Sequence, residues 1–149
     1  MGGSQMSSAS TFAKQSISTS VAQRMIAAAE QKAASMGLRI ATAIVDESGI
    51  LKAFSRMDGA PLVAVGISVK KGVTAVGFGM PTGKPWHDFV KDDPILLHGY
   101  QSIDDFTMFG GGFPIHVDGQ LVGAIGVSGG HYRNDEECAR AGLAALEST

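Results

Sequence analysis

The stretch FGGGFPIHVDGQLVGAIGVSGG, residues 109–130, decides the fold of this chain. It predicts a β-hairpin, because Asp118-Gly119 stands between two β-prone runs and supplies the positive φ values of a two-residue type I′ turn. Glycine weakens a strand, so the glycines after the turn and the run Gly110-Gly111-Gly112 before it indicate close approach by a ligand or by another backbone. Packing against a helix or a neighbouring subunit explains them equally well, and both interpretations stay open here.

Upstream of this hairpin, the pattern predicts a helix over residues 20–36, with Ser20 and Gln23 as its capping box. Two strands, joined by a turn, follow over residues 39–45 and 50–56. The remaining expected elements are a helix over residues 63–75, a loop over 77–83, short helices over 85–90 and 95–98, and a last helix from Asn134 or Asp135. The order α-β-β-α, short helices, β-β-α contains no βαβ unit. We therefore expect an α+β, profilin-like fold, with helices packed on the faces of a mainly antiparallel sheet.

Length and composition limit the class of protein. A chain of 149 residues suits one domain, which we expect over residues 19–149, after a disordered Ser/Gly-rich tail over residues 1–18. This tail lacks the apolar core of a signal peptide, and no run approaches the roughly 20 apolar residues of a membrane span. We therefore expect a cytoplasmic protein that does not bind membranes.

Charge and cysteine content disfavour some classes of partner and site. The net charge is −2 with no basic stripe, which disfavours nucleic acid, and the single cysteine, Cys138, excludes an intramolecular disulfide or a cysteine-based metal site. Only 17% of residues are charged and the mean hydropathy is +0.13. Such a composition indicates apolar surface that a homo-oligomer larger than a dimer would cover.

The chain resembles the GlcG/HbpS-like family, which includes the C-terminal domain of PduO-type proteins. The resemblance covers nearly everything from residue 20 onward. It rests on the motifs Ile44-Val45-Asp46 with Gly49, Arg56-Met57-Asp58-Gly59-Ala60, Lys71 with Thr74-Ala75, Thr82, Gly111-Gly112-Phe113-Pro114-Ile115, Gly123-Ala124-Ile125-Gly126-Val127-Ser128-Gly129, Asp135-Glu136 and Cys138-Ala139.

This resemblance implies a profilin-like fold, homo-oligomers that are often octamers, and haem as the ligand of some members. Haem binding in PduO-like domains uses a histidine of the N-terminal helical region, and this chain has no histidine before His87. The Glu-x-x-Glu iron site of secreted relatives is also missing, since Glu30 stands alone in the first expected helix. Haem therefore remains a candidate ligand for which no axial residue is carried over.

Residues 83–100 have the composition of a ligand site. They hold the only tryptophan, Trp86, two of the four histidines, and Lys84. A loop rich in titratable and aromatic groups beside a glycine-lined floor predicts that Trp86 and His87 cover a bound molecule. The alternative is that Trp86 packs the short helix down and leaves His87 in solvent.

The candidate site residues divide into two groups. Acid–base groups would come from His87, His131 and Lys71, because imidazole titrates near neutral pH and an amine can bind an anion. We expect no metal site, since histidines 87, 98 and 131 match no compact ligand motif. The candidate ligand-binding residues are Arg56, Lys84, Trp86, Gly110, Gly111, Gly112 and Ser128.

Three functions are compatible with the sequence. The first is binding of a small molecule, either haem or another tetrapyrrole or a small carboxylated metabolite, in a pocket between the glycine-rich hairpin and the Trp86-His87 loop. The second is a cofactor-independent enzyme that uses His/Lys acid–base chemistry on a small oxygenated metabolite. The third is a structural or assembly role, in which subunit contacts fill the glycine-lined region.

Overall fold

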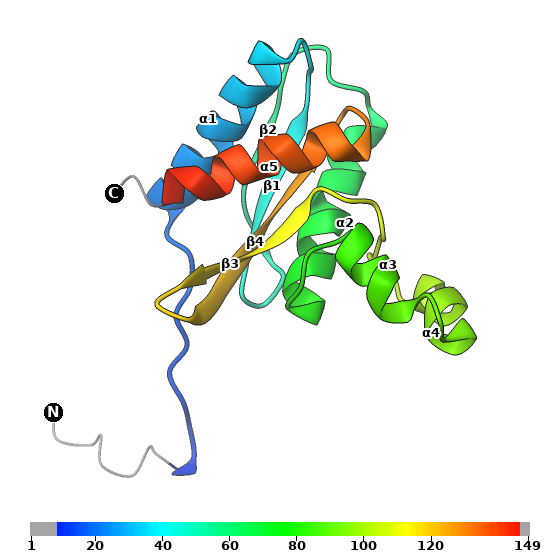
Figure 1. The fold of residues 1–149 in the computed structure, drawn as a ribbon. Helices are drawn as coiled ribbons and strands as arrows, with labels where there is room; N and C mark the ends of the chain where they lie inside the picture. The colour runs from blue at the N-terminus through cyan, green and yellow to red at the C-terminus, as the bar shows by residue number, and fades with distance from the viewer. Residues whose placement is uncertain (1–8, 147–149) are drawn as a thin grey trace, which may run out of the picture.

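A four-stranded antiparallel sheet lies at the centre of the computed structural model, which describes residues 9–146 (Figure 1). The strand order is β2-β1-β4-β3. The strands are β1 (Ala41–Asp46), β2 (Leu51–Arg56), β3 (Gly112–Val117) and β4 (Gln120–Ser128). The α+β fold with helices on an antiparallel sheet is therefore confirmed.

The two hairpins expected from the sequence meet through their inner strands. β1 pairs antiparallel with β2 and also with β4, in a register that sets Ala41 opposite Ser128 and Asp46 opposite Gly123. The β3–β4 turn has φ of 51° at Asp118 and 79° at Gly119. Both values are positive, as a type I′ turn requires, so this turn is confirmed.

Two helices cover one face of the sheet. α1 (Thr19–Ser35) and α5 (Tyr132–Leu146) pack against each other and against this face, and Figure 1 shows them crossing side by side. Gly142 on α5 allows this close approach, because a Cβ atom there would lie 3.1 Å from the Met25 carbonyl oxygen on α1. The main core lies beneath them and includes Met25, Ile26, Ala29, Ala33, Ile40, Ile44, Ile115, Ile125, Val127, Cys138 and Ala139.

α2 (Val63–Phe78) covers the opposite face and explains two of the strand glycines. A Cβ atom on Gly126 would collide with the carbonyl oxygen of Ser68, and one on Gly112 would collide with that of Lys71. Both carbonyls belong to α2. Helix packing therefore accounts for these glycines, which is one of the two interpretations left open by the sequence.

The short helices α3 (Lys84–Val90) and α4 (Pro94–Gly99), with the 3₁₀ turn η2 (Tyr100–Ser102), extend from one end of the molecule beyond α2 (Figure 1). Trp86 fixes α3, because its ring lies 4.2 Å from that of Phe78 and 5.9 Å from that of Tyr100, measured between centroids. Only 3% of Trp86 is exposed. Trp86 therefore packs the short helix down rather than covering a pocket as a lid.

Several predicted boundaries were wrong by a few residues. The cap of α1 is Ser18 rather than Ser20, and its side chain accepts a hydrogen bond from the Val21 N–H at 3.3 Å. Ile17 is only 4% exposed and its N–H donates to the Val122 carbonyl at 3.1 Å, so the folded domain begins before residue 19. The rest of the expected tail includes residues 1–8, which lie outside the described residues.

The ends of two other helices also differ from the prediction. α2 continues through Gly77 to Phe78, where a loop was expected, and α5 begins at Tyr132 instead of Asn134 or Asp135. Short-range signals place such ends poorly because tertiary packing extends or trims a helix by a turn. Within residues 9–146, no helix is both long and apolar enough to cross a membrane.

Candidate functional site

A buried ion pair joins three elements at one end of the sheet. The Lys71 Nζ on α2 donates to Asp135 Oδ2 on α5 at 3.0 Å and to the Val127 carbonyl oxygen on β4 at 2.7 Å. Asp135 Oδ1 accepts a hydrogen bond from the Gly130 N–H at 2.9 Å. Both side chains are 2% exposed. The pair therefore fixes the start of α5 against the sheet and α2.

Burial sets the protonation chemistry of this pair. Removal from water lowers the pKa of Lys71, and the negative charge of Asp135 opposes that shift. Burial likewise raises the pKa of Asp135, and the charge of Lys71 and the Gly130 N–H oppose it. Each charge is thus tolerated in the interior only because the other is present.

A cavity of about 320 Å³, here called the small cavity, opens above the ion pair. Apolar side chains from the first two turns of α2 form one wall, and Phe109 and Tyr132 form another. Ser128, His131, Lys71 and Asp135 supply its polar side chains. The full lining is Pro61, Val63, Ala64, Ile67, Lys71, Phe109, Ser128, Gly129, Gly130, His131, Tyr132 and Asp135.

A larger cavity of about 670 Å³, here called the aromatic cavity, adjoins the small cavity and shares Phe109 and Tyr132 with it. Its lining combines aromatic rings, a thioether, a histidine and three charged side chains. The lining residues are Gly83, Lys84, His87, Tyr100, Met108, Phe109, Gly110, Tyr132, Arg133 and Glu136.

An ion pair lies at the rim of the aromatic cavity. Lys84 bonds Asp88 one turn further along α3, and this hydrogen bond lowers the pKa of the Asp88 carboxyl. Both side chains are solvent-exposed, so the pair restrains Lys84 only weakly.

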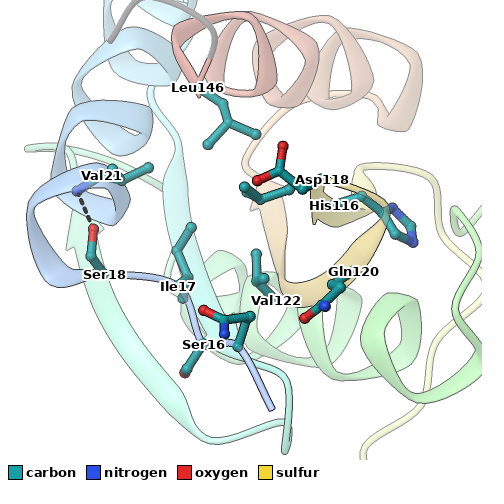
Figure 2. A pocket seen from close by; sticks show the side chains of 11 residues that line it. Ser16, Ile17, Ser18, Val21, His116, Asp118, Gln120, Val122 and Leu146 are labelled. Atoms are coloured by element: carbon teal, nitrogen blue, oxygen red, sulfur yellow. Dashed lines mark hydrogen bonds between the residues drawn. The ribbon is translucent and has the colours of Figure 1, made fainter. Parts of the chain in front are cut away.

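A third cavity of about 700 Å³, here called the N-terminal cavity, lies between the segment before α1, the tip of the β3–β4 hairpin and the end of α5 (Figure 2). Ile17, Val122 and Leu146 give it an apolar floor, and His116 and Asp118 belong to its polar rim. Its lining contains no lysine or arginine. The residues are Gln15, Ser16, Ile17, Ser18, Val21, His116, Val117, Asp118, Gln120, Val122 and Leu146.

The structure divides the candidate site residues between two adjacent cavities. Lys84, His87 and Gly110 line the aromatic cavity, whereas Lys71, Ser128 and His131 line the small cavity. Four other candidates line neither cavity, namely Arg56, Trp86, Gly111 and Gly112.

Gly111 and Gly112 are accounted for by packing. A Cβ atom on Gly111 would lie 2.6 Å from the Val127 carbonyl oxygen and 3.0 Å from Lys71 Nζ, and Gly112 faces the backbone of α2. Arg56 ends the edge strand β2 with its side chain exposed. These residues shape the fold around the cavities without lining them.

Several lining residues were not identified from the sequence, among them Asp135, Phe109, Tyr132, Arg133 and Met108. Asp135 lies 64 positions from Lys71, and the sequence indicated it only as a possible start of the last helix and as part of a family motif. No local pattern marks such a pair, because only the packing of α2 and α5 brings it together. Throughout residues 9–146, no three His, Cys, Asp or Glu side chains gather as potential metal ligands.

The chain is similar in sequence and in fold to several known proteins. Residues 17–144 match the family described as haem degrading protein HbpS-like. The GlcG protein of Escherichia coli K12 is 33% identical over 112 residues, which are 75% of this chain and 81% of GlcG. The crystal structure of Klebsiella pneumoniae protein ORFY has a TM-score of 0.88 at 28% identity and covers 94% of this chain and 97% of that one. A PduOC:heme complex has a TM-score of 0.81 at 29% identity and covers 87% of this chain and 94% of that one.

Proposed function

The chain belongs to the haem degrading protein HbpS-like family, and from that premise we propose that it binds haem or a related tetrapyrrole in the aromatic cavity. One observation carries the proposal: this cavity brings a histidine, several aromatic rings and two cationic side chains together. The solved PduOC:heme complex shows that a domain of this fold accepts the ligand.

The residues of the aromatic cavity fit a tetrapyrrole in size and chemistry. Its volume of about 670 Å³ lies within the range of roughly 300–1,000 Å³ usual for small-molecule sites. Tyr100, Phe109 and Tyr132 offer rings against which a flat macrocycle can stack. Lys84 and Arg133 can bind the carboxylate side groups of a tetrapyrrole. The negative charge of Glu136 would repel these carboxylates and so favour their placement beside Lys84 and Arg133.

An iron ligand is available in the same cavity. Histidine, methionine and tyrosine all ligate haem iron in proteins, and His87 and Met108 line this cavity with Tyr100 and Tyr132. Of these groups, His87 would hold the iron, because neutral imidazole is the commonest metal ligand among them. Bound haem would supply a redox-active iron, while the protein would orient it and limit its contact with water.

Titration of the purified chain with haemin tests the assignment. We expect a Soret shift at stoichiometric haemin, together with quenching of the only tryptophan, since Trp86 contacts the cavity residue Tyr100. His87→Ala should weaken binding and change the spectrum. His98→Ala is the matched control, because His98 is an exposed histidine on the neighbouring α4 that does not line the cavity.

Two results would contradict this proposal. The absence of any Soret shift would remove haem as the ligand. A shift that survives His87→Ala but is lost in His116→Ala would place the ligand in the N-terminal cavity, which His116 lines.

The enzyme hypothesis has weaker support. Lys71 already donates to two acceptors, which restricts it as a base, and the two candidate histidines line different cavities. His87 and His131 would therefore not act together on one small substrate bound in either cavity.

We also propose that the chain forms a homo-oligomer larger than a dimer. Large apolar side chains are exposed at the start of α2 and on α4, with Leu62 81%, Val63 66% and Ile95 81% exposed. Exposed apolar groups of this size commonly mark surfaces buried by association.

A further inference from the structure

The Ser128 side chain lines the small cavity without a hydrogen-bond partner among the described residues. Only 7% of Ser128 is exposed, and its side chain bonds to no residue in the part of the chain that the structure describes. Strand alternation places it on the α2 face of β4, the face to which Gly126 also points. A hydroxyl that faces a cavity and has no partner in the protein is free to bond to a ligand atom, so Ser128 marks a position where such an atom would be held.

Two helices begin at this cavity. The first turns of α2 and α5 both line it, through Val63 and Ala64 on one side and His131 and Tyr132 on the other. The helices have 16 and 15 residues, and each start carries a partial positive charge from the helix dipole. Together they favour a negatively charged group.

Lys71 adds a further donor at the floor of the cavity. An ammonium group has three N–H donors, and two of them bond to Val127 and Asp135. The third has no partner among residues 9–146. Lys71 and the Gly130 N–H offset the charge of Asp135, so the carboxylate at the floor of the cavity is compensated.

The walls define the rest of the ligand. Val63, Ile67, Phe109 and Tyr132 present apolar surface, and the volume of about 320 Å³ is at the low end for a small-molecule site. An anion with a short alkyl group matches both parts. Inorganic phosphate satisfies the donors but leaves the apolar walls without contact.

From these features we propose that the small cavity is a second binding site, specific for a short-chain monocarboxylate. The carboxylate accepts hydrogen bonds from Ser128 Oγ and Lys71 Nζ near the two helix starts, and the alkyl chain packs against Ile67 and Phe109. This site shares only Phe109 and Tyr132 with the aromatic cavity. It does not depend on tetrapyrrole binding, and the failure of either proposal leaves the other intact.

Calorimetric titration of the full chain with propionate and butyrate tests this site. We expect both acids to bind. The isosteric neutral propionamide should bind at least about tenfold more weakly, because it lacks the negative charge. Inorganic phosphate should bind more weakly than propionate. Absence of carboxylate binding, equal affinity for the amide, or a preference for phosphate would each overturn the proposal.

Ser128→Ala separates ligand binding from structure. Since the hydroxyl has no partner in the protein, this variant should keep or raise the melting temperature while it lowers propionate affinity about tenfold. Thr42→Val is the matched control, because the Thr42 hydroxyl likewise has no partner within residues 9–146 but lies on the opposite face of the sheet, on the adjacent strand β1. Its propionate affinity should not change. Equal losses in both variants, or an unchanged affinity in Ser128→Ala, would contradict the assignment of Ser128.

Discussion

Replacing Lys71 with methionine should remove a large part of this domain's free energy of unfolding. The variant leaves the Asp135 carboxylate buried without its cation and removes the donor to the Val127 carbonyl. At the observed 3.0 Å, two unit charges attract by about 5.5 kcal/mol at an effective dielectric constant of about 20. Breaking buried pairs costs about 3–5 kcal/mol, so we expect a loss of this size. A domain of this kind is stable by only about 5–15 kcal/mol.

A double-mutant cycle isolates the interaction. Asp135→Asn alone should be similarly destabilising, since it leaves Lys71 as an unpaired buried cation. The double variant, with methionine at position 71 and asparagine at 135, contains no buried charge. Its destabilisation should be smaller than the sum of the two single losses by about 2 kcal/mol or more.

Urea unfolding followed by circular dichroism measures these free energies. The slope of free energy against urea concentration must stay the same among variants for the comparison to hold. Lys84→Met is the matched control, because it breaks the exposed Lys84–Asp88 pair, which solvent screens, and it should leave the free energy of unfolding nearly unchanged. A loss below about 1 kcal/mol for Lys71→Met, or additive losses from the two single variants, would refute the claim that the buried Lys71–Asp135 pair stabilises the fold.

Three further predictions follow from packing, burial and exposed surface. Gly126→Ala should destabilise the domain by about 1–3 kcal/mol in urea unfolding, because the new Cβ atom would meet the Ser68 carbonyl. Gly66→Ala, at an open position of α2, is the control and should not destabilise the domain. Equal effects of the two substitutions would contradict this packing. Burial raises the pKa of Cys138 to about 11, so its thiol should resist alkylation at pH 8 until the protein unfolds. The thiol of the unfolded chain ionises at lower pH than the buried thiol, so the contribution of Cys138 to the free energy of unfolding should fall as the pH rises from about 9 to about 11. Cys138→Ala should lack this fall. Parallel pH profiles of stability for the two proteins would contradict the raised pKa of Cys138. Light scattering at micromolar concentration should give more than twice the monomer mass of 15.4 kDa, and the mass of a monomer or a dimer would contradict the proposed oligomer.

The sequence by itself determined most of the secondary structure and the class of fold. Asp118-Gly119 specified the second hairpin, because a type I′ turn depends on the φ preferences of two adjacent residues. Alternating and helical patterns found both hairpins and all three long helices, since these patterns depend on neighbours a few positions apart. The same local motifs carried the resemblance to the HbpS-like family.

Only the tertiary structure decided how the site is arranged. It separated His87 from His131 into two cavities and buried Trp86 against Phe78, although the sequence placed all of them around one pocket. It also paired Lys71 with Asp135 across 64 positions. The physical reason is that cavities and buried ion pairs arise where separate elements pack together. Long-range packing of this kind has no local signature for a single sequence to reveal.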